Sequence, residues 1–254
     1  METETLQIHL NSKDAIKYNN GTSDCDFNFN TIEILPQYYI HLSVKHAVIP
    51  YSFYNVNKTN NTLIIRSFSI PFSYSSLQTI TLSIGNHNIN TLLADLKSKI
   101  DSHFTITYNS LTNKMTFTNS LYDFCLVNTS TALELLGFGT TTTDLYDNGM
   151  SLTSLYVMNL QPVQCICINS NFISNSITSG NQNNGTIIAS MPINNQPFTM
   201  ITYSNQTNYK INLFSNVFNR ISIKFQDQNG NLIDLNNLHW SMTLQFDILK
   251  FTED

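Results

Sequence analysis

The sequence predicts an all-β protein, either a β-sandwich or a jelly roll, with a small mixed α/β insertion. Short runs with an apolar residue at every second position recur along the 254 residues, and clusters of Asn, Ser, Thr and Gly separate them. One central block changes to the period of a helix. No repeat of fixed length is present, which argues against solenoids and propellers. We therefore expect eight to ten short strands in the β part of the chain.

The expected strands lie on both sides of the insertion. Before it, four runs alternate apolar and polar residues, at 6–10, 27–34, 38–50 and 63–70. After it come six more, at 163–168, 185–193, 198–204, 209–214, 221–227 and 240–251. We assign residues 1–75 and 150–254 to the two parts of one β domain.

Residues 76–149 are expected to form the insertion. The apolar stripe of an amphipathic helix runs through Ile89, Leu92, Leu93, Leu96 and Ile100, and Asn88 is its expected N-cap. A hairpin should follow at residues 104–117. A second, short helix is expected in "STALELLGF", because Thr131 and Glu134 have the spacing of a capping box. Gly137 stands where a left-handed residue often ends a helix.

Few residues of this chain are charged. Charged residues make up 11% of it, against a usual share of about 25%, and the net charge is −5. Two explanations stand: a neutral surface that packs against neighbours, or coding biased towards A/T-rich codons. No basic stripe is present, so we expect no direct binding of nucleic acid. No run is apolar enough for a membrane span, and the acidic amino terminus is unlike a signal peptide.

No residue pattern of a catalytic or metal site stands out. The glycines are scattered, HExxH and CxxC are absent, and the six histidines lack ligand spacing. Cys165 and Cys167 lie two apart on an expected strand, which suits two thiols on one face better than a disulfide. We therefore expect no enzyme, no cofactor and no bound metal, with cysteines kept reduced.

The stretch "QDQNGNLIDL" allows two interpretations. Asp227, Asn229, Asn231 and Asp234 offer alternating oxygen ligands for calcium. They lack the terminal glutamate of an EF-hand loop and lie between strands. The simpler interpretation, which we favour, is a tight turn in which Asn229 and Gly230 connect two hairpin strands.

Six stretches in the same order resemble a known group of proteins. They are "VKHAVIPYSFYNVNKTNNTL", "IGNHNINTLLADL", "YNSLTNKMTF", "LLGF", "NGTIIASMPI" and "FQDQNGNLIDLNNLHWSMTLQF". Together they are similar to minor capsid and penton proteins of virophages, polinton-like viruses and related large eukaryotic DNA viruses. The residues that carry the motifs are Pro50, Tyr51, Phe53, Tyr54, Gly85, Gly137, Gly230 and Trp240. His87 departs from the Tyr common in that group, and "QPVQCICI" replaces a more basic segment.

The resemblance implies a single jelly-roll β-sandwich with an insertion between strands. It also implies a structural virion protein, foremost the penton that closes the five-fold vertices of an icosahedral capsid as a homopentamer. Its partners would be itself and the major capsid protein. It would reside in the virion after synthesis in the host cell cytoplasm or a virus factory. The alternatives are a minor capsid cement protein between capsomers and a carbohydrate-binding attachment module.

Trp240 bears on these alternatives. It is the one tryptophan of the chain and opens the last alternating run. In a jelly roll, it would bury a large ring where the two sheets meet a loop. The other interpretation is a tryptophan that stacks on a glycan, as in a lectin.

Overall fold

The computed structural model describes residues 2–68, 75–172 and 186–250. It divides into two compact units. The first combines Met1–Phe53 with Val163–Asp254, and the second is Tyr54–Pro162. The expected strand positions 69–70, 185 and 251 lie outside the described residues.

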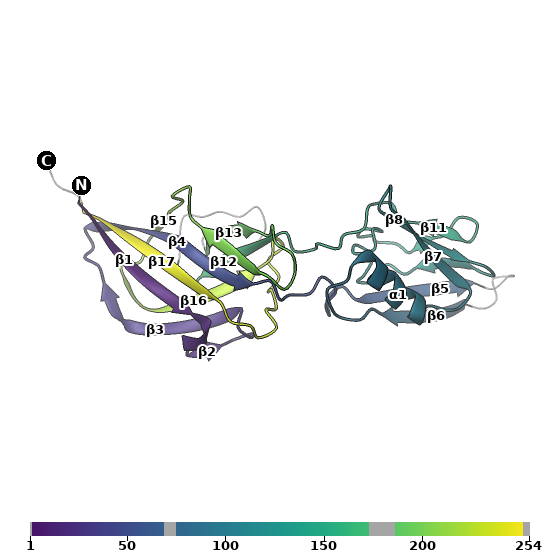
Figure 1. The fold of residues 1–254 in the computed structure, drawn as a ribbon, viewed down its shortest axis with the longest axis horizontal. Coiled ribbons are helices and arrows are strands. Elements are labelled where there is room, and N and C mark those ends of the chain that lie inside the picture. Colours follow the sequence, from purple (N-terminus) through teal and green to yellow (C-terminus); the bar gives the residue numbers. More distant parts are fainter. Residues whose placement is uncertain (1, 69–74, 173–185, 251–254) are drawn as a thin grey trace. The chain divides into compact units, whose positions relative to one another are not determined.

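The first unit is a sandwich of two antiparallel sheets (Figure 1). One sheet has the order β1 (Glu2–Asn11), β17 (Ser241–Lys250), β4 (Tyr38–Pro50) and β14 (Met200–Ser204), and β15 (Ile211–Leu213) also pairs with β4. The other has the order β13 (Ile187–Pro192), β12 (Cys165–Ser170), β16 (Val217–Gln226), β3 (Asp24–Glu33) and β2 (Lys17–Tyr18). A short 3-10 helix, Ser12–Asp14, follows β1.

The strand pairs of this unit are nested. β1 pairs with β17, β3 with β16, β4 with β14 and β15, and β12 with β13, all antiparallel. The first strand thus meets the last, and the innermost pair, β12 with β13, comes directly after the insertion in sequence. Successive pairs alternate between the two sheets, which is the arrangement of a jelly roll. Strands from before and after the insertion therefore build one sandwich, as predicted.

Alternate residues of these strands fill the core. On β17, Met242, Leu244 and Phe246 are buried between more exposed neighbours. On β16, Ile221, Ile223 and Phe225 face them from the other sheet as part of the same apolar cluster. The period-two pattern of the sequence thus marks the inner face of each sheet.

The second unit has its own core. One sheet has the order β10 (Leu145–Tyr146), β9 (Asp123–Leu126), β5 (Thr62–Phe68) and β6 (Ser75–Thr81). The other has the order β11 (Ser151–Thr153), β8 (Lys114–Asn119) and β7 (Phe104–Asn109). Helix α1 (Ile89–Lys99) buries Leu92 and Leu96 in the apolar cluster of this unit. Asn88 caps α1 in a reciprocal capping box with Thr91, which confirms the predicted N-cap.

The second unit is longer at both ends than the expected 76–149. At its start, β5 pairs with β6 and β9, so this strand is part of the insertion. At its end, β11 pairs with β8 of the hairpin. Because β5 alternates as the jelly-roll strands do, its sequence pattern alone could not show which sheet it joins.

The predicted short helix near residue 131 was wrong, because this segment forms turns. The Thr131 hydroxyl oxygen accepts a hydrogen bond from the Thr62 N–H at 3.0 Å, so it ties the segment to β5. Ala132 N–H also donates to Thr62 O, at 2.9 Å. These hydrogen bonds to β5 use the groups with which a capping box would have begun a helix. Gly137 has a φ of +83°, as expected for a left-handed position.

Candidate assembly surfaces

The motif residues Pro50 to Tyr54 lie where the chain leaves the jelly roll. Pro50 ends β4, and the buried rings of Tyr51 and Phe53 stack with centroids 4.4 Å apart. Tyr51 N–H donates to Thr199 O at 2.8 Å, and Phe198 N–H donates to Tyr51 O at 2.9 Å. Tyr54 is the first residue of the second unit. These motif residues therefore serve the packing and direction of the chain.

Asn55 organises the start of the second unit. Its side-chain amide donates to His87 O at 2.8 Å and to Leu160 O at 3.0 Å, and its oxygen accepts from His87 N–H at 2.8 Å. Next to it, Val56 and Gly85 form an isolated bridge, with N–H···O distances of 3.1 and 3.0 Å. Asn55 thus joins the first and last segments of the unit to the segment before α1. Sequence reasoning did not single it out, although it lies in the first motif, because asparagines are frequent in this chain.

Trp240 belongs to the core of the sandwich. Its side chain is 2% exposed, and it meets Phe225 and Phe27 edge-on at 4.9 and 5.8 Å between centroids. The indole N–H donates to Thr22 O at 2.6 Å. Its backbone N–H donates to the Ser12 hydroxyl oxygen, and its C=O accepts from the Ser12 N–H, each at 3.0 Å. Ser12 lies on the connection after β1. A ring enclosed in this way is not available to stack on a glycan.

The stretch around Gly230 is a turn, with Gly230 at a φ of +84°. One Asp227 oxygen accepts from the N–H groups of Asn229 and Asn231, both at 2.8 Å, and the other accepts from the Asn231 side chain at 3.0 Å. After this turn, Leu232 forms a single bridge to Gln226, so the turn closes no full hairpin. The carboxylate therefore organises the turn through these hydrogen bonds. Over residues 2–68, 75–172 and 186–250, no group of three His, Cys, Asp or Glu side chains could hold a metal ion.

All four cysteines are free thiols. Burial raises the pKa of Cys25 to about 12 and those of Cys125 and Cys167 to about 11. The sulfurs of Cys165 and Cys167 lie 3.9 Å apart, as expected for neighbours on one face of β12. The raised pKa values keep Cys25, Cys125 and Cys167 protonated near neutral pH, which makes these three thiols poor nucleophiles.

The outer face of the β1–β17–β4 sheet is polar but nearly uncharged. Across β1 and β17, the Gln7 side-chain amide donates to the Gln245 side-chain oxygen at 3.2 Å. The Nδ1 atom of His9 lies 3.0 Å from the Thr243 hydroxyl oxygen. The buried carboxylate of Asp247 pairs with Lys210 at 2.7 Å, and Thr5 donates to it at 3.2 Å. Burial alone would raise the pKa of Asp247, but these bonds and a third from Gln245 hold it below its usual value. This face therefore offers neutral hydrogen-bonding groups to a neighbour.

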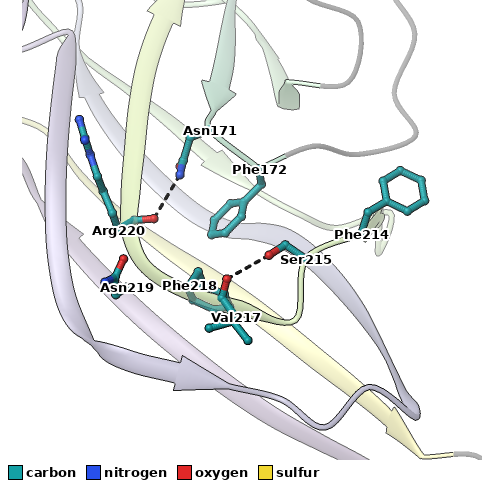
Figure 2. A pocket seen from close by; sticks show the side chains of 8 residues that line it. All are labelled: Asn171, Phe172, Phe214, Ser215, Val217, Phe218, Asn219 and Arg220. Carbon is teal, nitrogen blue, oxygen red and sulfur yellow. Dashed lines mark hydrogen bonds between the residues drawn. The ribbon is translucent and has the colours of Figure 1, made fainter.

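Apolar side chains are exposed at both ends of the sandwich. At the end where β4 begins, Leu35, Tyr39, Phe214 and Val217 are exposed. Beside them lies a hollow of about 400 Å³ (Figure 2). Its lining includes the buried rings of Phe172 and Phe218 and the exposed Phe214 on the β15–β16 connection. At the end where β4 finishes, Phe198 and Met200 are exposed.

Asp26 is a strongly buried carboxylate on the outer face of the second sheet. It is 1% exposed, pairs with Arg220 and accepts a hydrogen bond from Ser222 at 2.6 Å. Burial works to raise the pKa of Asp26, but the bonds from Ser222, Arg220 and Asn19 outweigh it and lower the pKa. This network joins β3 to β16.

The fold defines the class of this protein: a single jelly roll with a folded unit inserted between β4 and β12. No protein-family model matches the chain. No curated protein matches it either. Among the described residues, no helix is long and apolar enough to cross a membrane.

Among solved structures, the chain is similar to the mavirus penton protein. The TM-score is 0.53 at 14% sequence identity, and the match covers 98% of this chain and 100% of that chain. VP17, a capsid protein of bacteriophage P23-77, and the VP16–VP17 complex of the same phage are each 9% identical. Those matches cover 99% and 97% of this chain and all of theirs, but their TM-scores of 0.19 and 0.18 carry no weight. At 14% identity the mavirus match establishes the shared fold.

Proposed function

We propose that the protein is a structural capsid protein that forms the penton at the five-fold vertices of an icosahedral virion, as a homopentamer. The observation that carries this proposal is the end-to-end structural match to a penton protein, with the insertion included in the match. The order of the six sequence motifs supports it independently. The proposed neighbour of the ring is the major capsid protein, and the proposed place of the protein is the virion.

A five-membered ring needs two different surfaces on each subunit, because its contacts are head to tail. The first unit has such surfaces in its two sheet faces and its exposed apolar ends. The outer face of the β1–β17–β4–β14 sheet spans four strands, of which β1 and β17 have ten residues each, or roughly 19 by 33 Å. An area of about 600 Å² is close to the ~800 Å² that each partner buries in a standard interface. The few charges on this face agree with contact through neutral groups.

The mass of the purified protein in solution tests the ring directly. Light scattering coupled to size exclusion should give about 145 kDa, five times the 28.9 kDa of the chain. A monomer at all concentrations up to about 100 μM, in the presence and absence of the major capsid protein, would contradict the penton proposal.

The position in the particle distinguishes the penton from a cement protein. A reconstruction of the virion should show the jelly roll of this protein at the five-fold vertices. Density for it between capsomers at quasi-three-fold positions would replace the penton with a minor capsid role. The carbohydrate-binding alternative was suggested by Trp240, and this residue is buried and therefore not available to a glycan.

A further inference from the structure

Phe198 occupies a backbone position that suits glycine. Its φ is +67°, which is rare for a bulky residue. Pro197 precedes it in the turn between β13 and β14. Proline at the first central position and a positive φ at the second are the pattern of a type II turn, where glycine or asparagine is the usual second residue. The chain places an aromatic ring there instead.

The surrounding hydrogen bonds hold this conformation. Phe198 N–H donates to Tyr51 O, and Tyr51 N–H donates to Thr199 O, so the turn is fastened to the end of β4. Within the turn, the Thr199 hydroxyl donates to Gln196 O at 2.6 Å, and the Asn195 amide donates to Met200 O at 2.9 Å. The backbone is thus fixed on both sides of Phe198, and its ring is presented in a defined direction.

Among the described residues of the first unit, little packs against the Phe198 ring. Phe198 is 80% exposed, and Met200, two residues further on, is 53% exposed. A strained residue persists when the surrounding structure enforces it, and such residues gather at functional sites. Aromatic residues and methionine are also enriched in the cores of protein interfaces. Strain, exposure and residue type together indicate a contact made only after assembly.

The surroundings of Phe198 favour a neutral partner. No charged residue occurs between Ile193 and Tyr209. In the part of the chain that the structure describes, β14 pairs with β4, and no strand pairs with its other side. An apolar ring beside a neutral strand edge complements a surface that also has few charges. The chain itself has such a surface, since 11% of its residues are charged.

We propose that Phe198, supported by Met200, is the anchor by which one copy of this chain binds a second copy. The proposal rests on the proposed function, because it assumes a ring of identical subunits. The ring of Phe198 would lose its exposure against the neighbour, and the edge of β14 would lie beside it. Binding energy in interfaces concentrates in a few such residues.

Phe198→Gly separates the contact from the fold. Glycine removes the ring and also suits the positive φ, so the folded subunit should be at least as stable as wild type. Association should weaken at least about 30-fold per contact, which corresponds to a loss of about 2 kcal/mol. Phe198→Ala should weaken association equally but unfold at lower urea concentration than Phe198→Gly, because alanine keeps the strain. Unfolding is followed by Trp240 fluorescence in dilute, dissociated samples.

Leu111→Ala is the matched control. Leu111 is 93% exposed at the tip of the β7–β8 hairpin, so this change also removes an exposed apolar side chain. Its association should equal that of wild type. If Phe198→Gly assembles as tightly as wild type while wild type forms the pentamer, the anchor is refuted and the penton proposal stands. If wild type forms no oligomer, the penton proposal itself fails, and the anchor on a second copy fails with it.

Discussion

Replacement of Trp240 by phenylalanine tests how the jelly roll is closed at one end. Phenylalanine keeps an aromatic ring between Phe27 and Phe225 but lacks the N–H that donates to Thr22 O at 2.6 Å. A net hydrogen bond contributes about 1 kcal/mol. The smaller ring also lacks two buried carbon atoms, at roughly 0.8 kcal/mol each. We therefore expect the free energy of unfolding to fall by about 2–3 kcal/mol.

Urea denaturation followed by far-UV circular dichroism measures this change. In wild type, the fluorescence of Trp240 reports on the first unit alone, because the second unit has no tryptophan. The transition of that unit can thus be assigned before the variant is studied. Leu238→Ala is the control: Leu238 is exposed two residues away, so its loss should change stability by less than about 0.5 kcal/mol. A change of that small size for Trp240→Phe would refute the view that this ring closes the core.

Three further predictions follow from the described contacts. Gly137→Ala should destabilise the protein by about 2–4 kcal/mol, because its Cβ would lie 2.5 Å from Tyr156 O at a positive φ. Gly149→Ala, with a φ of +63° but no atom within 4 Å of its Cβ, should destabilise the protein by only about 1 kcal/mol. Equal losses of stability for the two variants in thermal unfolding would contradict this prediction. Since the pKa of Asp26 is lower in the folded protein, its stabilisation is present above pH ~4 and is lost as pH falls through the folded pKa. The free energies of unfolding of wild type and Asp26→Asn, measured against pH, should therefore converge below the folded pKa of Asp26. Parallel curves would speak against the Arg220 network. Finally, particles should retain this protein up to about 1 M salt, where the Debye length is ~3 Å, and its selective release by salt would show that ion pairs hold it.

Local sequence patterns determined most of the secondary structure. Alternation of apolar and polar residues located nearly all major strands of the jelly roll, because one face of each is buried. The stripe from Ile89 to Ile100 and the cap at Asn88 located α1, because a helix repeats its buried face every 3.6 residues. Gly137 was predicted at a positive φ for a local steric reason. The ordered motifs added the expectation of a single jelly roll with an insertion.

Only the tertiary structure decided what depends on contacts between distant segments. Thr131 and Glu134 have capping-box spacing, but the bond from Thr62 uses the Thr131 oxygen and the segment forms turns. The strand at 62–68 has the pattern of a jelly-roll strand, but its partners place it in the second unit. Pairing in sheets joins residues far apart in sequence, so periodicity shows that a strand exists without showing which strand it pairs with.

The same distinction applies to the candidate sites. Trp240 had two interpretations in the sequence, and burial against Phe27 and Phe225 decided between them. Neither Asn55, which lies within the first motif, nor Phe198 was singled out from the sequence. The importance of Asn55 comes from hydrogen bonds to residues 32 and 105 positions away. That of Phe198 comes from a backbone angle enforced by Tyr51, about 150 residues earlier in the chain, which is a property of the folded chain and not of its neighbouring residues.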